Sequence, residues 1–257
     1  MKNMTNNTAD AHDGFVFRPQ NDEKTDKIGL TFGAPNGDDI KTVAETVKNL
    51  REGCEAYTQL SLDGENSASL FLVGKDGNGK IKKTVFSYGD TVYVFEKKAA
   101  KIYVNAAVTP LGEIVGNAPC VMEYVGDVPN ENEKVSTFAG TDIIKSFLLT
   151  TNFVLSRSDE IRYVHRVRAS AVGFAKVFGI CDGNGSALSV ASIVAENEKY
   201  ALIGDVFTHP NSRNRGFAAA ACLACCRCAM QKGKTPWLIC SPETSAYYSR
   251  LSFREIG

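Results

Sequence analysis

The sequence lacks an excess of charge of either sign. Lys and Arg together number 29, and so do Asp and Glu, so the overall charge does not indicate a nucleic-acid-binding protein. The chain also lacks any apolar run near the roughly 18 residues that suggest a membrane span. Its first 13 residues are polar, without the apolar segment of a signal peptide. These absences predict a cytoplasmic protein.

Histidine is scarce, with three in the chain. His12 lies in the polar N-terminal stretch, His209 stands beside Pro210, and His165 lies among arginines at 162–168. The histidines form no metal-binding cluster, and no Ser–His–Asp signature accompanies them. We expect 162–168 to be a strand, whose arginines either form a solvated face or attract an acidic substrate.

Eight cysteines are present, four of them between Cys222 and Cys228. In a chain of this length, reduced thiols are more typical than a disulfide framework. The C-x-x-C spacing suggests zinc, but zinc pairs of this type ordinarily lie on a turn. Here they lie in an expected helix, with Cys222, Cys225 and Cys226 on one face. Packing in the core is the favoured interpretation, and a metal site is the alternative.

The length of 257 residues allows one large domain or two modest ones. Residues 126–134 are polar, acidic and contain proline, which is typical of a linker. We therefore expect a flexible N-terminus at 1–13, an N-terminal α/β domain at 14–128 and a C-terminal domain at 129–257.

Hydrophobic periodicity and turn residues predict helices and strands in both halves. In the first half we expect a helix at 38–52 and strands at 14–17, 69–73, 81–86, 91–95, 101–104 and 121–125. In the second half we expect helices at 142–149, 216–231 and 243–251, and strands at 162–168, 171–180, 187–195, 200–208 and 236–240. A strand, helix and strand in succession require a crossover, so the expected fold class is α/β with a mixed sheet.

One stretch is typical of a phosphate site. A strand ends at Asp205–Thr208, a turn at Arg213–Gly216 carries two arginines and a glycine, and an alanine-rich helix follows. Backbone N–H groups converge in such a turn, and the helix start adds the positive end of its dipole. The alternative is a surface turn with two solvated arginines. The order of strand, turn and helix favours the phosphate site.

Three motifs in the second half resemble the GNAT superfamily of acyl-CoA-dependent N-acyltransferases, and most nearly its FR47-like branch. Residues 213–218 (Arg-Asn-Arg-Gly-Phe-Ala) fit the family's pyrophosphate signature, the strand 203–208 matches its central strand, and 248–253 (Tyr-Ser-Arg-Leu-Ser-Phe) resembles its ending. The resemblance is strong over 180–257 and looser over 134–179. It implies a mixed, partly splayed β-sheet flanked by helices, and it allows a degenerate second copy of that fold in the first half.

The resemblance implies transfer of an acetyl group from acetyl-CoA to a primary amine of a small molecule or peptide. It implies no metal, nucleic acid or membrane, and a homodimer is an open option. The residues implied to bind the coenzyme are Val206, Phe207, Thr208, Arg213, Asn214, Arg215, Gly216, Phe217, Ala218, Ser241 and Ser245. The N–H of Val206 is implied to polarise the thioester carbonyl, and Tyr248 to protonate the departing thiolate as general acid. The alternative for Tyr248 is packing against the core.

The sequence also departs from the family. Ser241 stands where members often have asparagine, and Ser252 where they usually have glycine. Leu202 occupies the likely position of a glutamate base used by some members, and the nearest acid, Asp205, is pointed away from the site by strand alternation. The family's last strand has no counterpart before Gly257, so this edge of the sheet is incomplete or completed by another segment. A non-catalytic acyl-CoA-binding regulatory module is therefore the second hypothesis.

Overall fold

The computed structural model describes residues 54–61, 70–88, 91–96, 99–104, 119–151, 157–173 and 176–256. The strand predicted at 14–17 and the helix predicted at 38–52 lie outside these residues. In the described first half the strands are β1 (Ala56–Ser61), β2 (Leu70–Lys75), β3 (Ile81–Tyr88), β4 (Thr91–Glu96) and β5 (Ala99–Val104). Of these, β1 was not predicted, and only one of its residues, Leu60, is fully buried.

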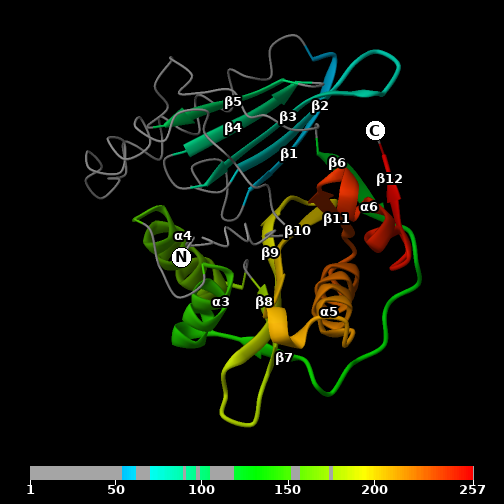
Figure 1. Cartoon of the computed structure of the whole chain (residues 1–257). Coiled ribbons are helices and arrows are strands. Elements are labelled where there is room, and N and C mark those ends of the chain that lie inside the picture. The colour runs from blue at the N-terminus through cyan, green and yellow to red at the C-terminus, as the bar shows by residue number, and fades with distance from the viewer. Residues whose placement is uncertain are drawn as a thin grey trace, which may run out of the picture.

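The second half contains both strands and helices (Figure 1). Its strands are β7 (Ser136–Phe138), β8 (Lys176–Cys181), β9 (Ala187–Glu196), β10 (Tyr200–Thr208), β11 (Thr235–Cys240) and β12 (Phe253–Glu255), and β6 (Cys120–Tyr124), from the end of the first half, joins their sheet. Its helices are α3 (Ile143–Thr150), α4 (Arg157–Ala171), α5 (Phe217–Gln231) and α6 (Pro242–Ser249), with 3₁₀ turns η1 (Gly140–Asp142) and η2 (Pro210–Ser212). None of the helices in the described ranges is long and apolar enough to cross a membrane.

All described strands belong to one 12-stranded sheet, with the main order β12-β6-β11-β10-β9-β1-β2-β3-β4-β5. The strands β8 and β7 extend it from β9 on a separate branch. The β10–β11 pair is parallel, and the other pairs are antiparallel. The predicted α/β fold class with a mixed sheet is therefore confirmed.

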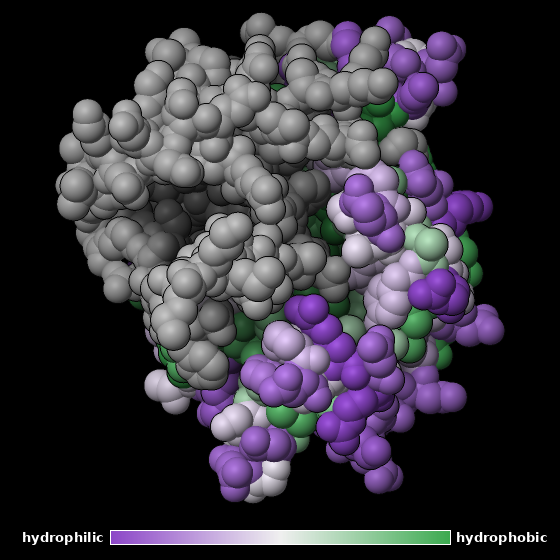
Figure 2. Space-filling view, in the orientation of Figure 1, coloured by the Kyte–Doolittle hydropathy of each residue, from purple (hydrophilic) through white to green (hydrophobic). Residues whose placement is uncertain are grey.

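Helices cover both faces of this sheet in the second half (Figure 1). One core cluster lies between the sheet and α5 and α6 and includes Ile203, Val206 and Tyr248. Another lies beside α3 and includes Phe147 and Phe207. Hydrophilic side chains cover much of the described surface in Figure 2, with smaller hydrophobic areas between them.

The strand predicted at 162–168 is wrong, because these residues lie within α4. The strand predicted at 171–180 begins at Lys176, after that helix has ended at Ala171. Arg166 and Ala169 are buried, and Tyr163, Val167 and Ser170 are partly buried. Burial that recurs every three or four residues is the pattern of one face of a helix. The strand prediction was wrong because it followed the alternation of charged residues instead.

The strand β6 fills the place between β11 and β12. Met122 is opposite Leu238 of β11, and Tyr124 is opposite Phe253 of β12. A segment from before the predicted linker at 126–134 thus completes the sheet of the second half. Residues 126–134 themselves form no helix or strand. The division into domains at 128/129 stays a prediction.

Candidate active site

The strands β10 and β11 separate in the middle of the sheet. Their parallel pairing runs from Tyr200 opposite Thr235 to Ile203 opposite Leu238. Beyond that pair, β10 continues to Thr208 and β11 to Cys240. The splayed strand expected from the sequence is confirmed. Backbone groups along such an opening can pair with an extended ligand.

A β-bulge lies where β10 leaves β11. Gly204 is opposite Ser192 of β9 and Phe207 is opposite Val190, so two residues of β10 face one of β9. The extra residue changes the strand's alternation. Ile203 and Val206 both pack in the α5-side cluster, whereas Phe207 packs in the α3-side cluster.

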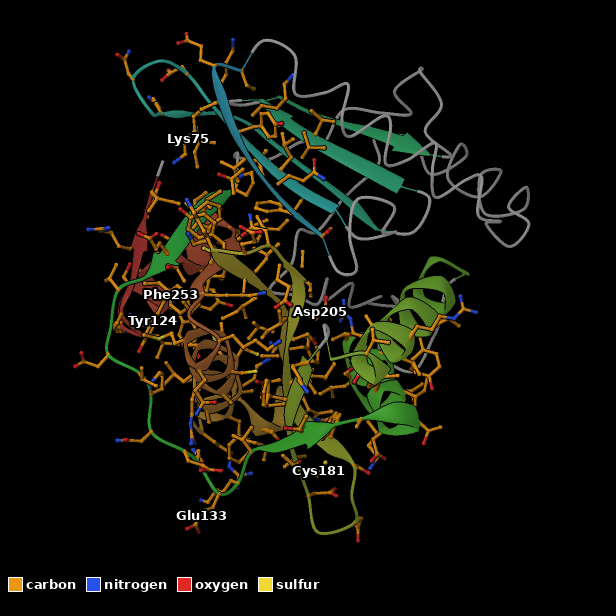
Figure 3. The ribbon with its side chains drawn as sticks, turned by 180° about the vertical axis from the view of Figure 1, so that it is seen from behind. Lys75, Tyr124, Glu133, Cys181, Asp205 and Phe253 are labelled. Carbon is orange, nitrogen blue, oxygen red and sulfur yellow. The ribbon has the colours of Figure 1, made fainter. Side chains whose placement is uncertain are left out.

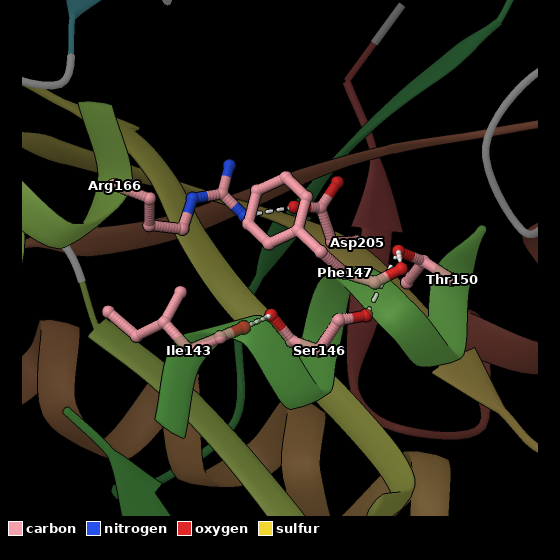
Figure 4. A network of polar contacts seen from close by, with 6 residues as sticks. All are labelled: Ile143, Ser146, Phe147, Thr150, Arg166 and Asp205. Carbon is pink, nitrogen blue, oxygen red and sulfur yellow. Dashed lines mark hydrogen bonds and ion pairs between the residues drawn. The ribbon is translucent and has the colours of Figure 1, made fainter. Parts of the chain in front are cut away.

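The bulge directs Asp205 toward α4. The carboxylate of Asp205 forms an ion pair with Arg166 of that helix (Figure 4). Figure 3 shows Asp205 between the sheet and the helices α3 and α4. Simple alternation along β10 would have put Asp205 on the same face as Ile203, so the alternation from which its direction was predicted does not hold at the bulge. Leu202, at the expected position of a glutamate base, is 4% exposed in a core cluster.

The last residues of β10 are held by β9. The Ser189 hydroxyl donates to the Phe207 carbonyl at 3.0 Å and lies 2.8 Å from Thr208 Oγ1. The N–H of His209 donates to the Leu188 carbonyl at 2.8 Å. The backbone on the β9 side of the opening is therefore anchored as far as the start of η2.

The predicted phosphate turn follows η2 and ends at Gly216, the N-cap residue of α5. Gly216 has φ 76° and Asn214 has φ 59°, so two residues of the turn adopt left-handed backbone conformations. A Cβ added to Gly216 would meet no atom within 4 Å. Glycine is thus favoured here by the backbone conformation, and the space around it is open.

Two guanidinium groups flank this turn. Arg213 Nε donates to the Thr208 carbonyl at 3.3 Å, and its Cζ lies 6.0 Å from the Phe207 ring centroid. Arg215 Cζ lies 4.9 Å from the Phe217 ring centroid. Both arginines remain exposed. Together with the N-terminal dipole of the 15-residue helix α5, they make this turn suitable for an anion.

Ser241 and Ser245 lie at the start of α6, on the other side of the opening. Ser241 is the N-cap residue, and its Oγ lies 3.3 Å from Thr244 Oγ1. A hydrogen bond from Ser241 lowers the pKa of the exposed Glu243 carboxyl. The Ser245 hydroxyl donates to the Pro242 carbonyl at 2.8 Å. Both hydroxyls therefore have local contacts, and their roles toward a coenzyme stay predictions.

Tyr248 is buried, with 2% of its surface exposed. Its ring packs edge-on against Tyr247 at 5.1 Å and Phe253 at 5.9 Å between centroids. Phe253 in turn contacts Tyr124 of β6, and Figure 3 shows these two side by side. The burial agrees with the packing alternative, and Tyr248 belongs to the same core cluster as Val206 and Cys240. The general-acid role stays a prediction.

The predicted site residues differ in their burial. Those that are buried are Val206, Phe207 and Tyr248; those that are partly buried are Thr208, Phe217, Ala218, Ser241 and Ser245; those that are exposed are Arg213, Asn214, Arg215 and Gly216. Sequence reasoning missed the ion pair between Arg166 and Asp205. The helical spacing of Tyr163, Arg166 and Val167 was the signal that could have shown Arg166 to be buried.

The cysteines of α5 lie in the core. Cys222, Cys225 and Cys226 have 0% exposure, and Cys228 is partly buried. Burial raises the pKa of the Cys225 and Cys226 thiols well above the usual value. This environment favours packing, as interpreted from the sequence.

No protein-family model and no curated protein matches the chain. Several solved structures are similar. A protein from Novosphingobium aromaticivorans assigned to the GNAT family of acetyltransferases has 20% identity and a TM-score of 0.44, covering 53% of this chain and 59% of its own. The glucosamine-6-phosphate N-acetyltransferase of Arabidopsis thaliana has 18% identity and a TM-score of 0.38, covering 46% of this chain and 90% of its own.

A tandem GNAT protein from the clavulanic acid biosynthesis pathway is similar over more of the chain. It has 13% identity and a TM-score of 0.39, and the match covers 87% of this chain and 94% of that one. The chain thus spans less than two thirds of the first structure named above, 59%, and 94% of this one. Function depends on the residues at a site and does not follow from a fold.

Proposed function

We propose that this protein is an N-acyltransferase that transfers an acetyl group from acetyl-CoA to a primary amine of a small molecule or peptide. The observation that carries the proposal is the opening between β10 and β11 beyond Ile203 and Leu238, directly before the turn at Arg213–Gly216. An extended, amide-containing arm and a pyrophosphate are both parts of coenzyme A. The opening suits the first, and the turn suits the second.

The turn would bind the pyrophosphate. Its left-handed residues Asn214 and Gly216 curve the backbone immediately before α5, and Arg213 and Arg215 can add charge-assisted hydrogen bonds. Phe217 and Ala218 begin the helix, and their partial burial keeps α5 against the sheet. The FR47-like branch of the GNAT superfamily is the group that these residues resemble most.

The opening would bind the pantetheine arm. Val206, Phe207 and Thr208 lie past the last β10–β11 pair, so those of their backbone groups that do not bond to β9 or to Arg213 can complete a ladder with the arm's amides. The N–H of Val206 would polarise the thioester carbonyl. Ser241 and Ser245 border the opening from the start of α6, and Tyr248 would supply the proton for the thiolate.

Coenzyme binding is the first test. Acetyl-CoA at millimolar concentration should raise the melting temperature, because a ligand that binds only the folded state stabilises it. Replacing both turn arginines (Arg213→Gln with Arg215→Gln) should weaken the affinity measured by calorimetry about tenfold or more, as charged hydrogen bonds are lost. The control is Arg168→Gln, an exposed arginine of α4. Absence of any shift with the unaltered protein would rule the proposal out.

The second candidate is a non-catalytic acyl-CoA-binding module. The burial of Tyr248 and the ion pair formed by Asp205 favour it, because neither group is plainly available to an acceptor or a leaving group. This protein would bind acetyl-CoA and turn over none of a broad panel of amines.

Tyr248→Phe separates the two candidates. If the phenol is the general acid, turnover should fall by about 10²-fold or more with little change in coenzyme affinity. Tyr247→Phe is the matched control, because the neighbouring phenol has no proposed role. Full turnover in the Tyr248→Phe protein would exclude this tyrosine as the acid.

A further inference from the structure

The side chain of Arg166 connects α4 to the β10 bulge (Figure 4). Its Nη1 donates to Oδ2 of Asp205. The Arg166 side chain is 1% exposed and that of Asp205 is 16% exposed. The two residues lie 39 positions apart in the sequence, so the contact is set by the docking of α4 on the sheet.

Among the residues that the structure describes, Asp205 is the acidic group that pairs with Arg166. The guanidinium carbon lies 5.4 Å from the ring centroid of Phe147 on α3, and that ring packs edge-on against Tyr163 at 5.8 Å. Within the described part of the chain, Arg166 Nε is buried without a hydrogen-bond partner. A buried charge is stable only when it is paired. The position of Asp205 is therefore strongly coupled to that of Arg166.

Asp205 also has an uncommon backbone conformation. Its φ of 51° is left-handed, which aspartate tolerates better than most residues but which persists only where the surroundings hold it. The next residue, Val206, packs on the opposite face of the sheet with α5. Both residues lie between the register positions Gly204 and Phe207, immediately past the last pair of β10 with β11.

We propose that Arg166 is a positioning residue: through Asp205 it holds the β10 bulge in the conformation that presents the Val206 backbone to the opening between β10 and β11. The role of Val206 toward a thioester rests on the proposed function. The restraint of the bulge by α4 is independent of the proposed function.

Hydrogen–deuterium exchange on the full-length, coenzyme-free protein tests the restraint. Arg166→Met keeps the length and apolar stem of the side chain and removes its charge. We expect amide exchange in the segment 204–208 to become about tenfold faster or more, with little change in α5 or in the β2–β3 strands. The control is Arg168→Met, an exposed position on the same helix, which should leave the segment unchanged.

Two further variants keep the test decisive. Arg166→Lys keeps the positive charge but lacks the planar guanidinium group, so amide exchange at 204–208 should be slower than in Arg166→Met and faster than in the unaltered protein. This variant also takes the place of Arg166→Met if the Arg166→Met protein fails to fold. Combining Arg166→Met with Asp205→Asn should accelerate exchange by less than the product of the two separate factors, because each change removes the same contact. The inference is overturned if 204–208 is unaffected, if α4, α5 and the bulge accelerate together, or if the two factors simply multiply.

Coenzyme A titration by calorimetry separates this inference from the proposed function. If the unaltered protein binds coenzyme A, Arg166→Met should weaken binding several-fold while Arg168→Met does not. Equal affinities of the two variants for coenzyme A would show that the restraint of the bulge by Arg166 does not affect coenzyme binding. If the unaltered protein does not bind, the proposed function fails, and the exchange measurement still decides whether Arg166 restrains the bulge.

Discussion

Gly216 and Gly183 offer a comparison at the scale of single residues. A Cβ at either position would meet no atom within 4 Å, but only Gly216 has a positive φ, of 76°. The two glycines therefore differ in backbone conformation and not in the room around them. Gly216 is the residue from which the turn passes into α5.

We expect Gly216→Ala to lower the free energy of unfolding by about 1 kcal/mol, because an L-residue is disfavoured in the left-handed region. Gly183→Ala should be neutral or slightly stabilising, since alanine restricts the unfolded chain without straining the turn. Urea unfolding of both variants measures the difference. Equal effects would show that the conformation of Gly216 is not what favours glycine there.

Other residues near the site were predictable only in part. The turn at 213–218 was recognised because glycine and arginine side by side before an alanine-rich helix form a local signal. Tyr248 was also recognised, but its 2% exposure depends on Tyr247 and on Phe253 of β12, which no local pattern reports. The orientation of Asp205 depends on a bulge, which strict alternation cannot anticipate.

At the scale of elements, β6 has the largest consequence. It lies between β11 and β12, so both of its edges are paired. Its Glu123 accepts a hydrogen bond from Trp237 Nε1 at 3.3 Å and forms an ion pair with Arg254 at 3.2 Å. This strand therefore joins the last parallel strand of the sheet to the C-terminal strand.

Val121→Pro should disrupt β6, because a proline in a doubly paired strand removes a donor and fits poorly in the ladder. We expect a loss of about 1–3 kcal/mol in unfolding free energy and a red shift in the fluorescence of Trp237, the single tryptophan, which is 2% exposed. Val128→Pro, at an exposed position after the strand, is the control. Unchanged fluorescence and stability in Val121→Pro would contradict this role of β6.

The helices show where periodicity succeeded and where it was misread. The prediction at 216–231 lies within one residue of α5 because its cysteines and alanines recur at helical spacing, and Cys222, Cys225 and Cys226 are buried as expected. The prediction at 162–168 failed because α4 buries an arginine. Charged residues normally lie on the exposed face of a helix. A buried, paired arginine therefore hides the apolar face by which the helix would be recognised in the sequence.

At the scale of the whole molecule, the two halves share a core. Leu60, Phe71 and Val73 from the first half cluster with Leu202 and Trp237 from the second. The strand β1 meets β9 at the pair Ser61–Glu196, and Asn197 Nδ2 donates to the Gln59 carbonyl at 2.9 Å. We keep the two-domain division at 128/129, with a degenerate GNAT-like copy in the first half, as a proposal.

The amino-acid sequence by itself determined the features that depend on neighbours along the chain: the turn at 213–218, the strand before it, the helix after it and the mixed sheet that their order requires. Only the tertiary structure decided the pairing of β6 with β11 and β12 and the contact of Arg166 with Asp205. Strand pairing and burial of an ion pair join residues far apart in sequence, and their free energies depend on how whole elements pack.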